Sequence, residues 1–231
     1  MSSNMPRLPR NAPDGAIHHV LNRANARAAI FHRPADYDHF LYLLAEAKDR
    51  TPMRILGFCV MKNHWHLVLW PFSGVELSAF MAWLTNAHVR NHHTKHRTCG
   101  YGHIYQGRYK NFIVQTDRHL LTVLRYVEAN ALRAGLVQRA EDWPWSSAHA
   151  GTAPDGRLLL SLSPVPRPQN WSTYLNEHPS KDLVKQLRTS VKRNAPFGDE
   201  TWRRQVALDL GLEPTLRPLG RPRKGDSHLF T

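Results

Sequence analysis

The chain lacks any long hydrophobic run, which separates it from proteins that cross a bilayer. None of its apolar stretches approaches the ~20 consecutive residues that a transmembrane helix needs. The first fifteen residues, MSSNMPRLPRNAPDG, also lack the hydrophobic core of a secretory signal. We therefore expect neither a membrane partner nor export.

Cysteine is nearly absent as well. Cys59 and Cys99 are the two cysteines in 231 residues, too few for a disulfide framework or for a metal site built from thiolates. Such scarcity favours a reducing compartment. We expect both thiols to be reduced in a cytoplasmic protein.

Acidic residues are few in relation to basic ones. Asp and Glu number 18 against 31 Lys and Arg, which gives a formal net charge of +13. This excess favours a polyanionic partner, most often nucleic acid, although solubility alone is an alternative explanation. Basic residues recur beside aromatic ones, as in GHIYQGRYKNF at 102–112. The pattern favours nucleic acid and predicts association with the nucleoid.

What is present is a series of short strand and helix patterns. Alternating or continuous apolar residues predict strands, and apolar residues at intervals of three and four predict helices. Strands are expected at 16–23, 53–61 and 64–70, a strand or hairpin at 103–115, and helices at 34–50, 74–97 and 117–135. This order predicts an α+β fold with a ferredoxin-like antiparallel sheet. We expect helices on one face of the sheet and the other face to be available for a partner.

The chain beyond residue 150 has a different texture from the first domain, 1–150. Residues 151–170 are rich in turn formers and predict a linker. Two short helices, capped by Ser180 and Asp199, predict a small helical extension over 171–214. The basic tail, 215–231, contains RPLGRPRK, which resembles an AT-hook, a motif that lies in the narrow minor groove of A·T-rich DNA. A generic phosphate-binding arm is the alternative for this tail.

Two histidines stand out in the stretch VMKNHWHLVLW at 60–70. On a strand, residues two apart share one face, with Cα atoms roughly 6.6 Å apart. The imidazoles of His64 and His66 can therefore converge on one cation, while Trp65 points into the core. Two ordinary histidines are the alternative, because this spacing arises easily in a chain with 15 histidines.

The helix expected over 117–135 offers oxygen atoms that could complete such a site. Tyr126 and Asn130 lie one turn apart on the flank of its apolar stripe, a flank shared with His119 and Arg133. Tyr126 supplies an oxygen nucleophile, and Asn130 supplies a neutral oxygen ligand. Taken without the histidines, the alternative is a tyrosine at the edge of the core beside a solvated asparagine.

Together these stretches resemble the REP-associated tyrosine transposases, a branch of the single-tyrosine HUH transposases. The resemblance covers about 16–151 and rests on HHVLNRANAR, MKNHWHLVLWP, GHIYQGRYK, RYVEANALRAGLV and DWPWSS in that order. It implies that 1–150 is a catalytic domain in which Tyr126 attacks DNA. It also implies a divalent metal, Mg²⁺ or Mn²⁺, held by His64, His66 and Asn130. Imidazole ligands by themselves suit Zn²⁺ or Ni²⁺ better.

The implied chemistry agrees with the properties of these groups. A free tyrosine has a pKa of ~10, and a cation beside it favours the phenolate and polarises a phosphate oxygen. Attack on a phosphodiester would give a 5′-phosphotyrosine and a free 3′ hydroxyl that can rejoin the strand. We expect a metal-dependent single-strand DNA endonuclease and strand transferase. A metallohydrolase that activates water and a non-catalytic DNA-binding protein are the alternatives.

The expected partner is single-stranded or hairpin DNA, bound by a monomer or a homodimer. Basic residues of the domain and of the tail are candidates for contacts to DNA: Arg23, Arg27, Arg108, Lys110, Arg217, Arg221, Arg223 and Lys224. Four aromatic residues could stack on bases or could instead belong to the sheet core: Tyr101, Tyr105, Tyr109 and Phe112. The chain departs from many relatives at Ala24 and Ala131, where glycine and proline are common.

Overall fold

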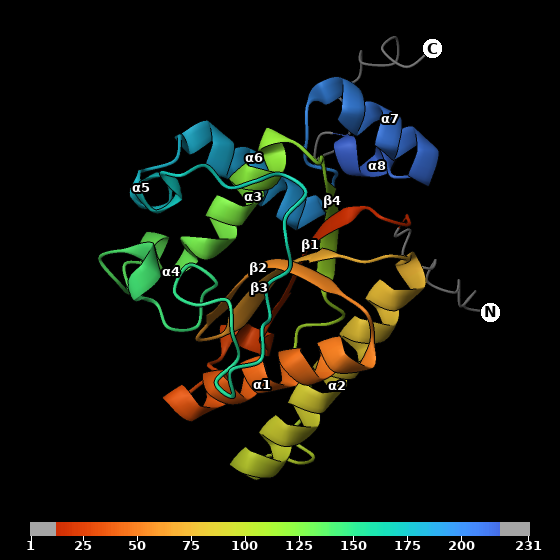
Figure 1. Cartoon of the computed structure of the whole chain (residues 1–231). Helices are drawn as coiled ribbons and strands as arrows, with labels where there is room; N and C mark the ends of the chain where they lie inside the picture. Colours follow the sequence, from red (N-terminus) through yellow and green to blue (C-terminus); the bar gives the residue numbers. More distant parts are fainter. Residues whose placement is uncertain (1–12, 218–231) are drawn as a thin grey trace, which may run out of the picture.

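The computed structural model describes residues 13–217 and has a four-stranded antiparallel sheet at its centre (Figure 1). The strands are β1 (Ile17–Arg23), β2 (Arg54–Met61), β3 (His64–Trp70) and β4 (Lys110–Val114), in the spatial order β2-β3-β1-β4. Helices α1 (Pro34–Arg50), α2 (Gly74–His96) and α3 (Arg118–Glu128) alternate with them in the chain. The predicted α+β class and the ferredoxin-like sheet are confirmed.

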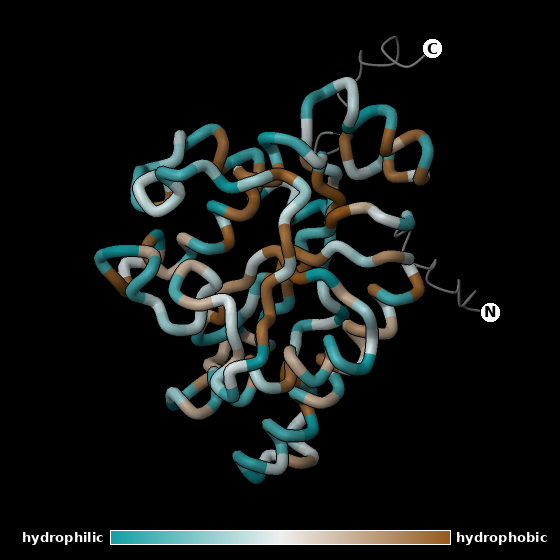
Figure 2. Tube along the Cα trace, in the orientation of Figure 1, coloured by the Kyte–Doolittle hydropathy of each residue, from teal (hydrophilic) through white to brown (hydrophobic). Residues whose placement is uncertain are grey.

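Helices α1 and α2 cover the first face of the sheet. Trp65 and Leu67 of β3 point to this face and pack with Phe40 of α1 and with Leu77 and Phe80 of α2 in one buried cluster. The first turn of α2 is fixed by a reciprocal cap, in which Ser73 accepts from the backbone N–H of Glu76 and Glu76 accepts from that of Ser73. In Figure 2, hydrophobic stretches follow the central strands, whereas the far end of α2 is largely hydrophilic.

The second face of the sheet is covered by α3, so the expectation of helices on one face only is corrected. Leu120, Leu124 and Val127 of α3 are fully buried, and each contributes ~1.5–3 kcal/mol by leaving water. The helix approaches β2 so closely that a Cβ atom on Gly57 would lie 2.8 Å from Cδ2 of Leu124. An apolar stripe identifies the buried side of α3, but it does not say which face of the sheet that side covers.

The later part of the chain packs on this second layer. Short helices α4 (Asn130–Arg133), η2 (Ala140–Asp142) and α5 (Trp171–Asn176) are followed by α6 (Lys181–Arg193), α7 (Glu200–Leu210) and α8 (Glu213–Leu216). The expected linker passes along β2, where Leu160 bridges Ile55. Beyond α6, Phe197 bridges Val114 of β4. The expected caps are present, since Ser180 accepts from Leu183 N–H and Asp199 from Trp202 N–H.

Two predicted elements are shorter in the structure. The strand or hairpin expected over 103–115 forms a continuous strand only at β4, with one isolated bridge between Tyr105 and Ala24. The Tyr105 side chain lies in the first core, where its hydroxyl accepts a hydrogen bond from Trp65 Nε1. The helix expected over 117–135 is interrupted at Ala129 and continues as α4. No helix within 13–217 is long and apolar enough to cross a membrane.

Candidate functional site

The two predicted histidines share the second face of the sheet. His64 and His66 lie at alternate positions of β3, and Trp65 between them is fully buried on the opposite face. Their ring centroids are 5.1 Å apart. The pair therefore sits on the face that α3 covers, where the rings of both residues can reach a common ligand.

A side chain of the β2–β3 turn fixes the proton of His64. Nδ1 of His64 lies 2.7 Å from Oδ1 of Asn63, and the amide nitrogen of Asn63 donates to the backbone oxygen of Arg27 at 2.9 Å. The second hydrogen bond sets the orientation of the amide, so its oxygen must accept from His64. His64 consequently carries its proton on Nδ1 and leaves the lone pair of Nε2 available to a cation, the arrangement common in metal sites.

His66 is held from behind by a third histidine. Nε2 of His19 lies 2.9 Å from Nδ1 of His66, and the His19 ring also packs on Phe112, with centroids 4.7 Å apart. This contact occupies Nδ1 of His66 and again leaves Nε2 as the nitrogen open to a ligand. The adjacent histidines at 18 and 19 were visible in the sequence, but neither was predicted as part of the site.

The histidines of this cluster are neutral at physiological pH. Burial, with smaller effects from the positive charges of Arg23 and Arg133, lowers the pKa of His64 to about 4. Burial also places the pKa of His66 well below its usual range and lowers that of His19 to about 3. Neutral imidazole is the form that coordinates metals. The donor set thus fits a divalent cation held by His64 and His66.

Tyr126 of α3 lies against His66 and against His19, whose ring centroid is 6.3 Å from that of the tyrosine. The Tyr126 ring is 5.9 Å from that of His66, in an edge-on arrangement, and the side chain is half-buried. Arg133 lies over the tyrosine ring, with Cζ 4.1 Å from the centroid. Burial lowers the pKa of Arg133, whereas its electrostatic interaction and hydrogen bond with Tyr126 act in the opposite direction. The sequence placed Arg133 on the flank of Tyr126, seven residues away, but indicated no role for it.

Asn130 is the first residue of α4 and is half-buried. Its backbone oxygen accepts from Ala134 N–H, and within residues 13–217 its side-chain amide forms no hydrogen bond. The structure thus places His66 in contact with both His64 and Tyr126, while Asn130 follows one turn after the tyrosine with an amide that has no hydrogen bond to any described residue. Its role as a ligand stays a prediction.

Three of the predicted DNA-binding residues border the pair. Arg23 is the strand partner of His64 across β1 and β3, and exposed Arg27 contacts the same site through its backbone oxygen. Lys110 is exposed at the start of β4, where it pairs with Leu21, the partner of His66. Arg108 lies elsewhere, in a groove of about 1250 Å³ beside α2.

The remaining predicted contacts do not gather at this site. Arg217 is exposed after α8, and the tail residues Arg221, Arg223 and Lys224 lie outside the described residues. Tyr105 and Phe112 belong to the two buried cores and cannot offer stacking surfaces, whereas Tyr101 is 86% exposed.

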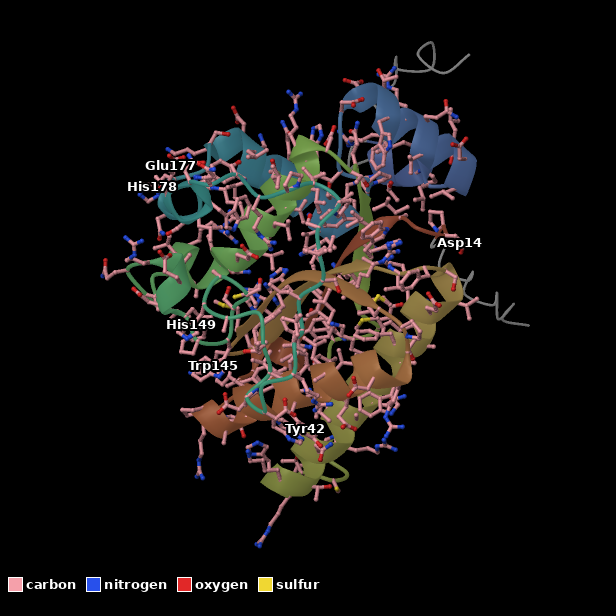
Figure 3. All side chains as sticks on the ribbon, in the orientation of Figure 1. Asp14, Tyr42, Trp145, His149, Glu177 and His178 are labelled. Atoms are coloured by element: carbon pink, nitrogen blue, oxygen red, sulfur yellow. The ribbon has the colours of Figure 1, made fainter. Side chains whose placement is uncertain are left out.

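A basic groove beside the tyrosine helix was not predicted. We call it the α6 groove: it has a volume of about 620 Å³ and runs between Arg133 of α4 and the exposed side of α6. His178, at the junction of α5 and α6, also borders it (Figure 3). Its cations are Arg133, Lys181, Lys185, Arg188, Lys192 and Arg193. The basic residues of the helix at 180–193 carried this signal, but only packing shows that they share a groove with Arg133, whose guanidinium lies over the Tyr126 ring.

Comparisons with known proteins identify the family of the chain. Residues 14–130, just over half of the chain, match the family model described as IS200-like transposase. A Haemophilus influenzae protein named as a REP-associated tyrosine transposase is 26% identical over 112 residues, which are 44% of this chain and 62% of that protein. The chain thus spans less than two thirds of that relative. A solved REP-associated tyrosine transposase bound to a REP hairpin aligns over 77% of this chain and 100% of its own, with 17% identity and a TM-score of 0.49. The resemblance to the REP-associated tyrosine transposases is confirmed, and the chain belongs to the IS200-like transposase family.

Proposed function

We propose that the protein cuts and rejoins single-stranded or hairpin DNA through a covalent bond to Tyr126. The observation that carries the proposal is the edge-on contact between Tyr126 and His66, whose ring centroids are 5.9 Å apart. The neighbouring His64 has its Nε2 lone pair free for a cation, because its Nδ1 donates to Asn63. A structural tyrosine would not need the rings of two neutral histidines, His66 and His19, and a half-buried guanidinium, that of Arg133, around it. Family membership supports the same reading, because transposases break and join DNA strands.

A divalent metal, Mg²⁺ or Mn²⁺, is proposed to be held by His64, His66 and Asn130. When bound, such an ion polarises a phosphate oxygen and favours the ionised form of a nearby phenol. The two histidines provide neutral nitrogen donors, and Asn63 and His19 hold them in place. Asn130 would add an oxygen donor, which hard cations prefer.

The proposed reaction exchanges one phosphodiester for another. The Tyr126 oxygen loses its proton and forms a bond to phosphorus, while the bond from phosphorus to the 3′ oxygen of the neighbouring nucleotide breaks. That oxygen takes up a proton and leaves as a 3′ hydroxyl, and the 5′ end stays on the tyrosine. Arg133, which lies over the Tyr126 ring, stabilises the phenolate and the phosphate during this exchange. The reverse reaction with another 3′ hydroxyl rejoins a strand.

The DNA is proposed to reach Tyr126 along basic surfaces on either side of it. Arg23, Arg27 and Lys110 border the histidine pair, and the α6 groove borders the tyrosine helix. Arg108 and the tail cations Arg217, Arg221, Arg223 and Lys224 are proposed as further phosphate contacts, which position the strand without reading its sequence. We place this activity in the cytoplasm at the nucleoid, in a monomer or a homodimer.

The test uses a single-stranded hairpin substrate labelled on the 3′ side of the cut. The parent protein should remain attached to the label through denaturing electrophoresis. Tyr126→Phe removes one oxygen and keeps the ring, so that the adduct and the cut should disappear together while binding persists. Tyr101→Phe is the matched control, because Tyr101 is 86% exposed, follows α2 on the first face of the sheet and keeps its ring in this variant, and it should behave like the parent.

Other outcomes separate the alternative functions. Cutting by Tyr126→Phe without an adduct from the parent would favour water as the nucleophile, as in a metallohydrolase. Binding without any cut by the parent would favour a non-catalytic DNA-binding protein. Either result contradicts the proposal.

A further inference from the structure

Three histidines gather at the far end of α2, on the face of the sheet opposite the proposed catalytic pair. His92 and His96 lie one turn apart on α2, and His32 precedes α1. Their candidate ligand atoms all lie within 4.8 Å of one another, and within residues 13–217 they form the one such group of three ligating side chains. The ring centroids are 4.5 Å apart for His92 and His96 and 5.1 Å apart for His32 and His96.

The central histidine of this cluster has no partner that explains its position. Both ring nitrogens of His92 are buried, and neither has a hydrogen-bond partner among the described residues. Burial, together with the neighbouring His96, His32 and His93, lowers the pKa of His92 to about 4. Two buried ring nitrogens without hydrogen bonds are costly, and a bound cation would satisfy one of them.

The segment that carries His32 is held against α2 by an acidic residue. Asp36 accepts from the backbone N–H groups of His32 and Arg33, at 2.8 and 3.0 Å, and pairs with Lys95 of α2 at 2.5 Å. The same carboxylate lies 3.8 Å from Nε2 of His96. The contacts of Asp36 therefore hold His32 and His96 close to each other, independently of contacts between the rings.

The residues that lie between this cluster and the first core are also closely packed. His88, one turn before His92, stacks on Phe31 with centroids 5.1 Å apart. Its Nδ1 lies 2.7 Å from the hydroxyl of Tyr105, which accepts from Trp65 Nε1. His88 is buried within this network, so the cluster above it rests on a rigid part of the first core.

We propose that His32, His92 and His96 bind one divalent transition-metal ion of the Zn²⁺ class, at a site separate from the catalytic pair. Sites rich in imidazole select Zn²⁺, Ni²⁺ or Cu²⁺ over Mg²⁺, and three protein ligands leave one position for water or another ligand. Zn–N distances of ~2.0–2.1 Å put the ligand nitrogens of one ion roughly 3.3 Å apart. The nitrogens of the three histidines already lie within 4.8 Å of one another, so small rotations of the side chains would bring them to that spacing.

The ion would join the segment before α1 to the end of α2. These parts are separated by about sixty residues of chain, and across the cluster the Asp36–Lys95 pair connects them directly. The Lys95 side chain is 44% exposed, but that of Asp36 is only 5% exposed, so this pair already holds the two segments together. A metal bound from both sides would add a second connection, and its effect should appear as stability rather than as DNA chemistry.

The experiment uses the full-length, untagged protein, stripped with chelator, in a His64→Ala/His66→Ala background. That background removes the catalytic pair, so the result does not depend on the proposed function. Titration with ZnCl₂ by calorimetry should show one ion per chain, with a rise in the unfolding temperature. MgCl₂ at the same concentration should cause no rise.

His32→Ala and His92→Ala, each made in the same background, identify the ligands. Either change should weaken Zn²⁺ binding at least about 100-fold, because removal of an outer-shell partner alone costs 10- to 100-fold. His32 is exposed, so His32→Ala keeps the fold even if His92→Ala does not. His149→Ala is the matched control, since His149 is an exposed histidine on the turn after Trp145 (Figure 3). Unchanged binding in His32→Ala, or no binding by the background protein, overturns the proposal.

Discussion

Nε2 of His19 lies 2.9 Å from Nδ1 of His66, a residue 47 positions later in the chain on the neighbouring strand. Both rings are buried. For Nε2 of His66 to offer a lone pair, its proton must lie on Nδ1 and be donated to His19. His19 is therefore a positioning residue for the proposed metal pair.

His19→Leu should raise the Mn²⁺ concentration needed for half-maximal cleavage by about 10- to 100-fold, because outer-shell partners orient metal-binding imidazoles. His19→Gln keeps an oxygen acceptor near Nδ1 of His66 and should recover most of the loss. The measurement is a Mn²⁺ titration of cleavage for both variants. Identical Mn²⁺ titrations for His19→Leu and the parent would show that His19 does not position the metal-binding imidazole of His66.

The α6 groove should contribute affinity for DNA and not chemistry. Lys185, Arg188 and Lys192 are exposed along it. Replacing all three with Ala should flatten the dependence of log K on log salt by about 2, because each neutralised phosphate of a single strand adds ~0.7 to that slope. The slope is measured by fluorescence anisotropy at several salt concentrations.

Arg204→Ala provides the control for the groove, because Arg204 is an exposed cation of α7 that pairs with Glu200. It should leave the salt slope unchanged, and the triple variant should still cut when substrate is saturating. A triple variant with the parent's slope contradicts the assignment of the groove.

Glu128 connects the tyrosine helix to the later part of the chain and should be essential for stability. It is buried and accepts hydrogen bonds from Arg167 at 2.7 Å, Trp171 Nε1 at 2.7 Å and Ser147 at 2.8 Å. Glu128→Ala should lower the free energy of unfolding by about 3 kcal/mol, since it leaves buried partners uncompensated. Glu200→Ala, which removes an exposed ion pair, should cost about 0.5 kcal/mol or less. Equal losses in urea unfolding would refute this difference.

The buried histidines predict that the protein loses stability in mild acid. Burial lowers the pKa of His18 to about 4 and those of His19 and His88 to about 3, whereas unfolded histidine titrates near 6.5. Below that pH these histidines bind protons in the unfolded chain but stay neutral in the native protein, so the free energy of unfolding falls as pH falls. Each histidine contributes up to about 1.4 kcal/mol per pH unit between 6.5 and its native pKa.

The acid effect is measured by urea unfolding between pH 7 and pH 5 in metal-free buffer. For these three histidines together the decrease should approach about 4 kcal/mol per pH unit below 6.5. A free energy of unfolding that stays constant over this range, or rises toward pH 5, is incompatible with neutral buried rings.

Local patterns were sufficient to predict much of the sheet and part of the site. The alternation of side chains on a strand placed His64 and His66 on one face, and the apolar spacing of 34–50 predicted α1 with both ends correct. Tyr126 was placed correctly on the flank of a helix, because its neighbours Leu124 and Val127 mark the buried side.

Contacts between distant segments were beyond this kind of reasoning. Nothing in a strand pattern pairs His19 with His66, because the register of β1 against β3 decides which side chains meet. The α6 groove depends on where Leu187 packs against α3, and Tyr105 lies in the first core, where its hydroxyl accepts a hydrogen bond from Trp65. The prediction that the second face of the sheet would be free for a partner was wrong for a similar reason. The sequence did not say on which face of the sheet α3 packs.

The identity of the nucleophile is the central claim, and peptide mapping of the covalent adduct tests it most directly. Trypsin cleaves after Arg125 and Arg133, so Tyr126 begins the peptide 126–133, in which it is the one tyrosine. The protein is incubated with the single-stranded hairpin and metal, denatured, and digested with nuclease and trypsin before mass spectrometry. The account predicts that peptide 126–133 carries a nucleotide phosphate on Tyr126. A nucleotide on any other tyrosine, or cleaved DNA with peptide 126–133 unmodified, would contradict it.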